Sequence, residues 1–216
     1  MLRLAAAVIT ALLLTAPSNA VRADDTPAAK PGVGVATFGS GCFWCTEYDF
    51  DKVPGVLTTT PGYMGGMSRK PTYDEVAEGK SGHIEVVQVT FDRNKVSYQM
   101  LLDYYWRTAD VVDGRGQFCD RGNQYRPVIF THDAEQAGLA KAGRDALDAS
   151  RRFDKPVAVE IRKASDFTKA EPEHQNFHTQ RPFWYFYYRR GCGRDKRLDR
   201  LWGKDRLDAA LRPQTN

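Results

Sequence analysis

Apolar and polar positions follow two different periods along the chain, and together they predict a mixture of strands and helices. Strict alternation over 83–91 (HIEVVQVTF) predicts a strand with one buried face. Shorter β-branched runs predict further strands at 33–38, 56–60, 128–130 and 157–161. Helical spacing predicts helices from 42 or 43 to the Pro54-Gly55 stop, and at 73–78, 95–108, 133–152 and 195–202. Strands and helices alternate without a G-x-G-x-x-G loop, which favours an α/β or α+β sandwich with a mixed sheet.

The first residues have the pattern of an export signal. Arg3 is followed by an apolar run over 4–15 and by the small-x-small sequence Ser18-Asn19-Ala20. This run is too short for an ordinary transmembrane helix. The sequence therefore predicts a signal peptide at 1–23, a polar leader at 24–32, a folded domain at 33–203 and a C-terminal tail at 204–216. The expected location is the periplasm.

Composition narrows the class of protein. The chain has 216 residues, 42% hydrophobic and 27% charged, which suits one globular domain. The formal charge of +4 comes without a basic stripe interleaved with aromatics, so we expect no nucleic acid partner. The segment RRGCGRDKR at 189–197 is locally basic and is typical of a solvated surface, with an anion or partner site as the alternative.

The motif GCFWCTE at 41–47 places Cys42 and Cys45 three residues apart. A zinc site is not expected, because no second CxxC motif is present and His174 and His178 lack the HExxH pattern. A thioredoxin-like redox pair, a structural disulfide and a single nucleophile remain as alternatives. At a strand-to-helix turn, Cys42 would face the positive end of the helix dipole, which predicts a lowered pKa.

Glu85 occupies the apolar face of the strand predicted at 83–91, together with Val87, Val89 and Phe91. A carboxyl group on such a face has a raised pKa, and a neutral carboxyl can donate a proton. The alternative is a glutamate at the strand end that reaches water. Loops offer further candidates, namely Tyr73 and the trio Cys119, Asp120 and Tyr125.

Together these segments resemble peptide methionine sulfoxide reductase of the A type. The resemblance rests on GCFWCTE, on GYMGG at 62–66, PTYDEV at 71–76, SGHIEVV at 81–87, CDRGNQYRP at 119–127 and EPEHQNF at 171–177. It spans nearly all of residues 33–203. It implies a two-layer α/β sandwich with a mixed sheet and a ferredoxin-like core, in which the reactive cysteine opens the first helix.

The resemblance also implies the roles of individual residues. Cys42 would be the nucleophile, and Glu85 the acid that protonates the sulfoxide oxygen. Tyr73 and Tyr125 would donate hydrogen bonds to that oxygen, and Asp120 would help to order the site. Preorganised donors of this kind act like an oxyanion hole.

Phe43 and Trp44 would hold the substrate methyl group. Attack by Cys42 would release methionine and leave a sulfenic acid, which a second thiol converts to a disulfide. The expected requirements are an external thiol reductant such as thioredoxin and no metal or other cofactor. We expect a monomer that acts on the S epimer, free or in proteins.

The resolving thiol stays open on sequence alone. Many members of the family have glycine where this chain has Cys45. Cys192, in a GCG segment, is the first choice, while Cys45 and Cys119 are the alternatives. Two other functions remain alternatives: a thioredoxin-like disulfide oxidoreductase that uses Cys42 and Cys45, and a secreted module with two structural disulfides.

Overall fold

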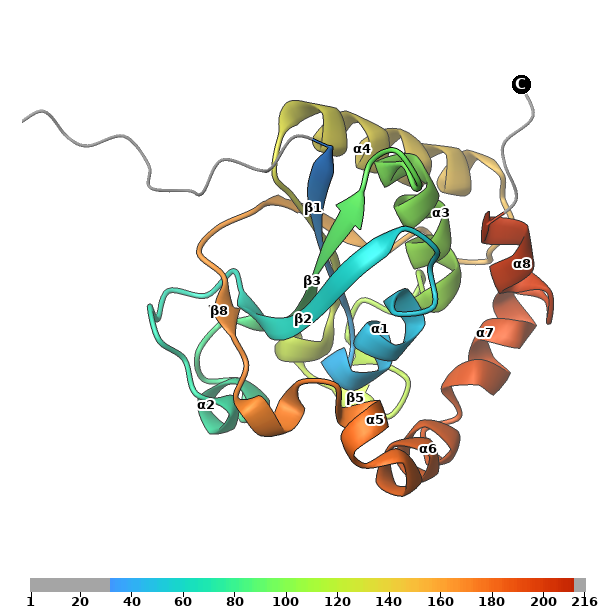
Figure 1. Cartoon of the computed structure of the whole chain (residues 1–216). Coiled ribbons are helices and arrows are strands. Elements are labelled where there is room, and N and C mark those ends of the chain that lie inside the picture. The colour runs from blue at the N-terminus through green and yellow to red at the C-terminus, as the bar shows by residue number, and fades with distance from the viewer. Residues whose placement is uncertain (1–31, 212–216) are drawn as a thin grey trace, which may run out of the picture.

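The computed structural model describes residues 32–211, which form a six-stranded mixed sheet covered by helices (Figure 1). The strand order is β7-β6-β1-β3-β2-β8, and every neighbouring pair is antiparallel except β6 and β7. The strands are β1 (Val33–Ser40), β2 (Val56–Met64), β3 (Ile84–Asp92), β6 (Pro127–Thr131), β7 (Glu160–Lys163) and β8 (Thr168–Lys169). The mixed sheet expected from the sequence is confirmed.

Eight helices accompany the sheet within the described residues. They are α1 (Phe43–Phe50), α2 (Tyr73–Ala77), α3 (Tyr98–Thr108), α4 (Ala134–Ala149), α5 (Phe177–Gln180), α6 (Pro182–Gly191), α7 (Arg194–Trp202) and α8 (Arg206–Leu211). The 3₁₀ turns η1 (Asn123–Tyr125) and η2 (Pro172–His174) and the small ribbon of β4 (Gly116–Gln117) and β5 (Asp120–Arg121) complete the chain. No helix among residues 32–211 has the length and apolar character needed to cross a membrane.

The alternation in β3 divides the core in two. Val87, Val89 and Phe91 face α1 and α3 in the main core. Ile84 and Val86 point to the opposite face, into a smaller cluster with Phe130 of β6. The period-two pattern therefore predicts correctly which side chains share a face. Glu85 lies on the same face as the main core, beneath α1.

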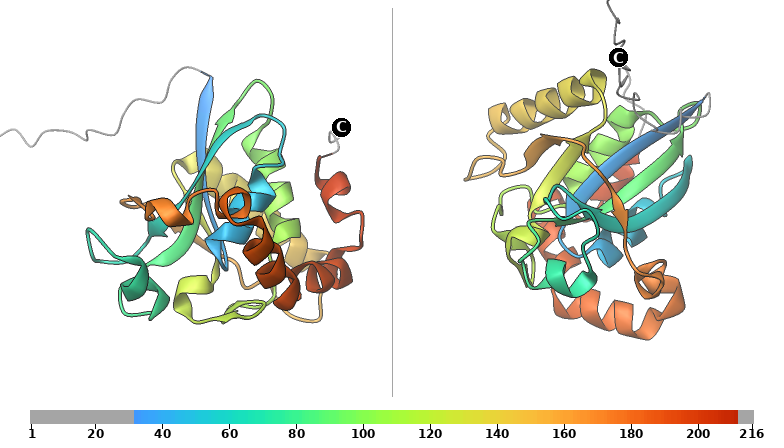
Figure 2. Two further views of the ribbon diagram at one scale, coloured as in Figure 1. Left: turned by 60° about the horizontal axis from the view of Figure 1, so that its bottom comes forward. Right: turned by 90° about the vertical axis from the view of Figure 1, so that its left-hand side faces the viewer.

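One end of the sheet gathers segments that are distant in sequence. There β1 runs into α1, and α2, the β4–β5 ribbon, α5 and α6 close around the start of α1 (Figures 1 and 2). The ring of Trp44 in α1 stacks on Phe177 of α5 with centroids 3.8 Å apart. The hydroxyl of Tyr188 in α6 donates to Asp120 of β5 at 2.6 Å. The candidate site residues lie at this end.

Two sequence predictions differ from the structure in their boundaries. The strand expected at 157–161 is found at Glu160–Lys163, because the Ala158 N–H donates instead to the carbonyl of Val111 at 2.7 Å. The tail expected at 204–216 contains α8. Arg206 of α8, 7% exposed, forms ion pairs with Asp195 and Asp199, and this attaches the segment to α7. The predicted signal peptide and most of the leader lie outside the described residues.

Candidate active site

Cys42 lies at the turn from β1 to α1, where it is the N-cap residue of the helix. Gly41 makes the turn possible with a φ of +87°, in the region that favours glycine. A Cβ at this position would lie 2.6 Å from the Cβ of Gln117, so the close approach of the β4 segment also requires glycine. The Cys42 side chain is 7% exposed. The thiol is therefore almost fully enclosed.

Glu85 reaches the start of α1 from the middle of the sheet. Its Oε2 accepts a hydrogen bond from the backbone N–H of Phe43 at 3.0 Å. The residue is 2% exposed, so the alternative of a strand-end carboxylate in water is wrong. Burial raises the pKa of Glu85 to about 8, although the Phe43 N–H lowers it. A neutral carboxyl, as the sequence predicts, is therefore the form favoured at neutral pH.

Tyr73 and Tyr125, the two predicted tyrosines, both lie near Glu85 and Cys42. Burial, followed by the charges of Glu85 and Cys42, raises the pKa of Tyr73 to about 12. Burial and the neighbouring Glu85, Tyr73, Asp120 and Cys42 raise the pKa of Tyr125 as well. Both phenols therefore keep their protons over the physiological range and remain hydrogen-bond donors. The structure brings together residues that are up to 83 positions apart in sequence.

Asp120, the first residue of β5, connects the β4–β5 ribbon to the start of α1. Its carboxylate accepts hydrogen bonds from the Tyr188 hydroxyl, at 2.6 Å, and from the backbone N–H of Cys42. Burial raises its pKa above the ordinary value, while these two bonds and Arg194 oppose the rise. Asp120 thus fixes the backbone at the nucleophile instead of pointing into solvent.

Aromatic rings pack against one another at the start of α1, next to Cys42. Phe43 and Trp44, both predicted to lie there, have ring centroids 6.5 Å apart, and Phe43 lies 6.4 Å from Tyr73. His174 stacks on Tyr73 at 4.2 Å and makes a 3.2 Å hydrogen bond with the indole N–H of Trp44. The arrangement suits a small apolar group such as a methyl.

Cys42 and Cys45 are both free thiols, and their side chains are hydrogen-bonded to each other. Burial first, then Cys45 and the charges of Glu85 and Asp120, raise the pKa of Cys42 well above its usual value. The prediction that the helix N-terminus lowers this pKa is wrong, because burial beside two carboxyl groups disfavours a thiolate there. The predicted module with two structural disulfides is excluded by the two free thiols.

The negative charge of the thiol pair is favoured on Cys45 instead. The hydrogen bond from Cys42 lowers the pKa of Cys45, and Arg194 and Arg189 lower it further. Both arginines are buried, at 1% and 5% exposed, and both form ion pairs with Asp49, at 3.5 and 2.9 Å. Two buried guanidinium groups therefore favour the thiolate form of Cys45 over that of Cys42.

The other two cysteines, Cys119 and Cys192, form a disulfide that joins the β4–β5 loop to the segment between α6 and α7. Their sulfur atoms and a carboxylate oxygen of Asp120 lie within 4.8 Å of one another. The bonded sulfurs offer no thiolate to a metal ion. His174 and His178 also do not share a site, since His178 faces Glu47 and Asp51.

The comparisons with known proteins decide the family. The chain matches the family described as peptide methionine sulfoxide reductase over residues 34–206. The chain belongs to this family. It is 45% identical over 185 residues to "Peptide methionine sulfoxide reductase MsrA 2" of Rhizobium meliloti, covering 86% of this chain and 91% of that protein. It is 44% identical over 173 residues to "Peptide methionine sulfoxide reductase MsrA" of Listeria monocytogenes, covering 80% and 98%.

A longer relative and two solved structures add to this assignment. The chain is 47% identical over 171 residues to the MsrA/MsrB protein of Vibrio cholerae, covering 79% of this chain but only 45% of that protein's length. Methionine sulfoxide reductase A of Corynebacterium diphtheriae matches with a TM-score of 0.62 and 30% identity, covering 71% of this chain and 77% of that one. Reduced Mxr1 of Saccharomyces cerevisiae has a TM-score of 0.67, covering 74% and 92%, and at 24% identity it supports the fold alone.

Sequence reasoning missed four residues at this reductase-family site. Glu171 accepts hydrogen bonds from the Tyr63 hydroxyl at 2.6 Å and from the Tyr73 N–H at 2.9 Å. Glu171 and His174 both lie in the EPEHQNF segment that carries the family resemblance, which was the available signal. Tyr188 and Arg194 lie in an aromatic and basic stretch where no motif distinguishes them from surface residues.

Proposed function

We propose that this chain reduces methionine sulfoxide to methionine, with Cys42 as the nucleophile. The observation that carries the proposal is the contact between Glu85 and the Phe43 N–H at 3.0 Å, one residue from Cys42. A neutral carboxyl beside a thiol provides both the acid and the nucleophile that this reaction needs. The phenols of Tyr73 and Tyr125 add donors for an oxygen that gains negative charge during attack.

The first step converts the Cys42 thiol to a sulfenic acid. Cys45, as thiolate, accepts the Cys42 proton through their mutual hydrogen bond while Cys42 Sγ attacks the sulfoxide sulfur. The oxygen moves from the substrate to Cys42 Sγ and takes a proton from Glu85. The products are methionine, Cys42 sulfenic acid, a Cys45 thiol and an ionised Glu85. The substrate gains the two electrons that Cys42 loses.

The second step forms a disulfide between Cys42 and Cys45. Cys45 Sγ attacks Cys42 Sγ, the S–O bond breaks, and the hydroxyl leaves as water with the Cys45 proton. In this structure Cys192 is joined to Cys119, so the thiol held against Cys42 is that of Cys45. Cys42 lies outside the helix as its N-cap, which leaves the backbone of this pair less constrained than a pair inside the helix.

The substrate and partners are proposed in the same way. Preference for the S epimer, action on free or protein-bound sulfoxide, and a thioredoxin-like reductant follow the family resemblance. A monomeric state and export to the periplasm extend the proposal, and the export signal rests on the pattern at residues 1–23. Mass spectrometry of protein recovered from the periplasm would detect cleavage within that segment.

The decisive experiment is an assay on resolved S and R sulfoxide epimers of N-acetylmethionine with dithiothreitol. Wild type should turn over the S epimer, and Cys42→Ser should not. Cys45→Ser should release about one methionine per protein in a single turnover and then stop when the only reductant is a dithiol protein. An inactive wild type, or an active Cys42→Ser variant, would contradict the proposal.

A thioredoxin-like disulfide oxidoreductase is the second candidate, because a Cys42–Cys45 dithiol begins a helix. Reduction of insulin disulfides separates the two functions. Activity there that survives in Glu85→Gln would favour the oxidoreductase.

A further inference from the structure

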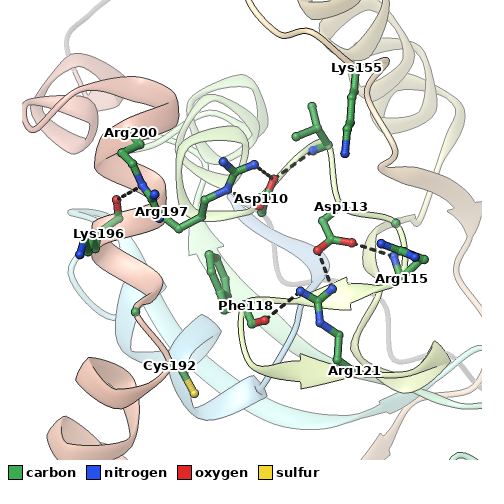
Figure 3. Close-up of a pocket in the computed structure, with 13 residues that line it drawn as sticks. Asp110, Asp113, Arg115, Phe118, Arg121, Lys155, Cys192, Lys196, Arg197 and Arg200 are labelled. Atoms are coloured by element: carbon green, nitrogen blue, oxygen red, sulfur yellow. Dashed lines mark hydrogen bonds and ion pairs between the residues drawn. The ribbon is translucent and has the colours of Figure 1, made fainter.

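A basic pocket lies beside the Cys119–Cys192 disulfide, outside the site described above (Figure 3). It has a volume of about 430 Å³, which is within the range of small-molecule sites. Arg115 and Phe118, which flank β4, form one wall, and α7 forms the other through Lys196, Arg197 and Arg200. Cys192 lies on its rim.

The charge of this pocket is strongly unbalanced. Six cationic side chains line it (Arg115, Arg121, Lys155, Lys196, Arg197 and Arg200), against the two acidic side chains of Asp110 and Asp113. The excess of four positive charges equals the formal charge of the whole chain. The pocket therefore concentrates the positive charge of a protein that is otherwise balanced.

The two acidic side chains are already neutralised. Asp110 accepts from Arg197 at 2.7 Å, and Asp113 accepts from Arg121 at 2.6 Å. Within residues 32–211, the side chains of Arg115, Lys155, Lys196 and Arg200 form no ion pair. Four cations from three segments of the chain thus line one cavity without an ion pair.

The adjacent disulfide is placed for exchange with a thiol. Cys192 lines the pocket, so a thiol bound there lies beside its sulfur, and the partner Cys119 is exposed. Cys192 directly precedes Gly193, the N-cap of α7. A thiolate released at Cys192 is stabilised by the positive end of that helix.

We propose that the basic pocket binds the carboxylates of a small anionic thiol that reduces the Cys119–Cys192 disulfide. The thiolate attacks Cys192 Sγ, which lines the pocket, the Cys119–Cys192 bond breaks, and Cys119 leaves as a thiolate. A second thiolate attacks the external sulfur of the mixed disulfide and releases Cys192. Two external thiols become one disulfide, and the protein gains two electrons and takes two protons from solvent.

The test measures reduction of this disulfide directly, by acid quenching, alkylation and mass spectrometry of Cys119 and Cys192. Three thiols of different charge serve as probes: mercaptosuccinate with two carboxylates, neutral 2-mercaptoethanol, and cationic cysteamine. Each rate is divided by the rate of the same thiol with hydroxyethyl disulfide, which removes the intrinsic reactivity. The variant is Lys155→Gln with Lys196→Gln, and the control is Lys95→Gln with Lys141→Gln, two exposed lysines elsewhere.

At low salt we expect the normalised rate of mercaptosuccinate to exceed that of 2-mercaptoethanol by about tenfold, with cysteamine slowest. The pocket variant should lose most of this preference and the control should keep it. Pyrophosphate should slow the reduction by mercaptosuccinate but not the reduction by 2-mercaptoethanol. Added salt should have the same selective effect. Equal normalised rates, or an equal loss in the control, would overturn the proposal. No sulfoxide is used, so this result is independent of the proposed catalytic function.

Discussion

The backbone N–H of Phe43 donates to Oε2 of Glu85 across 3.0 Å, and this bond ties the start of α1 to the middle of β3. The pKa of Glu85 is raised to about 8, so the carboxyl is protonated at neutral pH and ionised above pH 8. We expect sulfoxide reduction by the wild type to fall as the pH rises through about 8. Single-turnover rates between pH 6 and 10 measure this.

The variant Glu85→Gln should lower that rate about 10²-fold, because the amide donates a hydrogen bond but no proton. Its rate should lack the decline near pH 8.

The pH dependence of stability gives an independent check on the pKa of Glu85. The folded state binds the Glu85 proton more tightly than the unfolded state, so the wild type should lose stability relative to Glu85→Gln as pH rises from about 4.5 to 8. A difference that does not vary with pH would contradict the raised pKa.

Arg194 should matter both for stability and for the thiol behind the nucleophile. It is 1% exposed and donates to the carbonyls of Ser40, at 2.9 Å, and Thr108, at 2.7 Å. Arg194→Met should reduce the free energy of unfolding by about 3 kcal/mol in urea titrations, since it breaks a buried ion pair and leaves these carbonyls unpaired. The exposed Arg200→Met should change it by less than about 0.5 kcal/mol.

The same substitution should raise the pKa of Cys45, which Arg194 lowers. The pH dependence of iodoacetamide alkylation at Cys45, followed by mass spectrometry, reports this change. An alkylation profile identical to that of the wild type would show that the guanidinium group has only a structural role.

Gly41 and Gly138 should respond to alanine in opposite directions. Gly41 has a φ of +87° and packs against Gln117, so Gly41→Ala should destabilise the protein by at least about 1–2 kcal/mol. Gly138 lies inside α4, where an added Cβ would meet no atom within 4 Å, so Gly138→Ala should stabilise by about 0.5–1 kcal/mol. Thermal unfolding of both variants tests the pair, and a stabilising Gly41→Ala would refute the argument.

Removing the Cys119–Cys192 disulfide should lower stability without unfolding the chain under mild conditions. The bridge closes a loop of 73 residues, for which the chain-entropy relation gives about 4 kcal/mol. Urea titration of the variant with Cys119→Ser and Cys192→Ser measures this. A change below about 1 kcal/mol would contradict the prediction. It would mean that the bridge restricts the unfolded chain less than the relation assumes, or that the native loop is more stable without the bridge.

The sequence by itself determined the local features of this protein. Alternation at 83–91 predicted β3 and the face that carries Glu85, and glycine at position 41 predicted the turn that presents Cys42. These features follow from the backbone and from nearest neighbours along the chain, so a local pattern specifies them. The family resemblance likewise needed only the order of short motifs.

Only the tertiary structure decided the electrostatics of the site. The pKa of Cys42 is raised, not lowered, because burial beside Glu85 and Asp120 outweighs the helix N-terminus. The pKa of Cys45 is lowered by the hydrogen bond from Cys42, and also by Arg194 and Arg189, which lie about 150 residues further along the chain. The pairing of Cys119 with Cys192 is decided in the same way. Burial and long-range charge depend on which distant segments come together, and no local pattern in the chain encodes that directly.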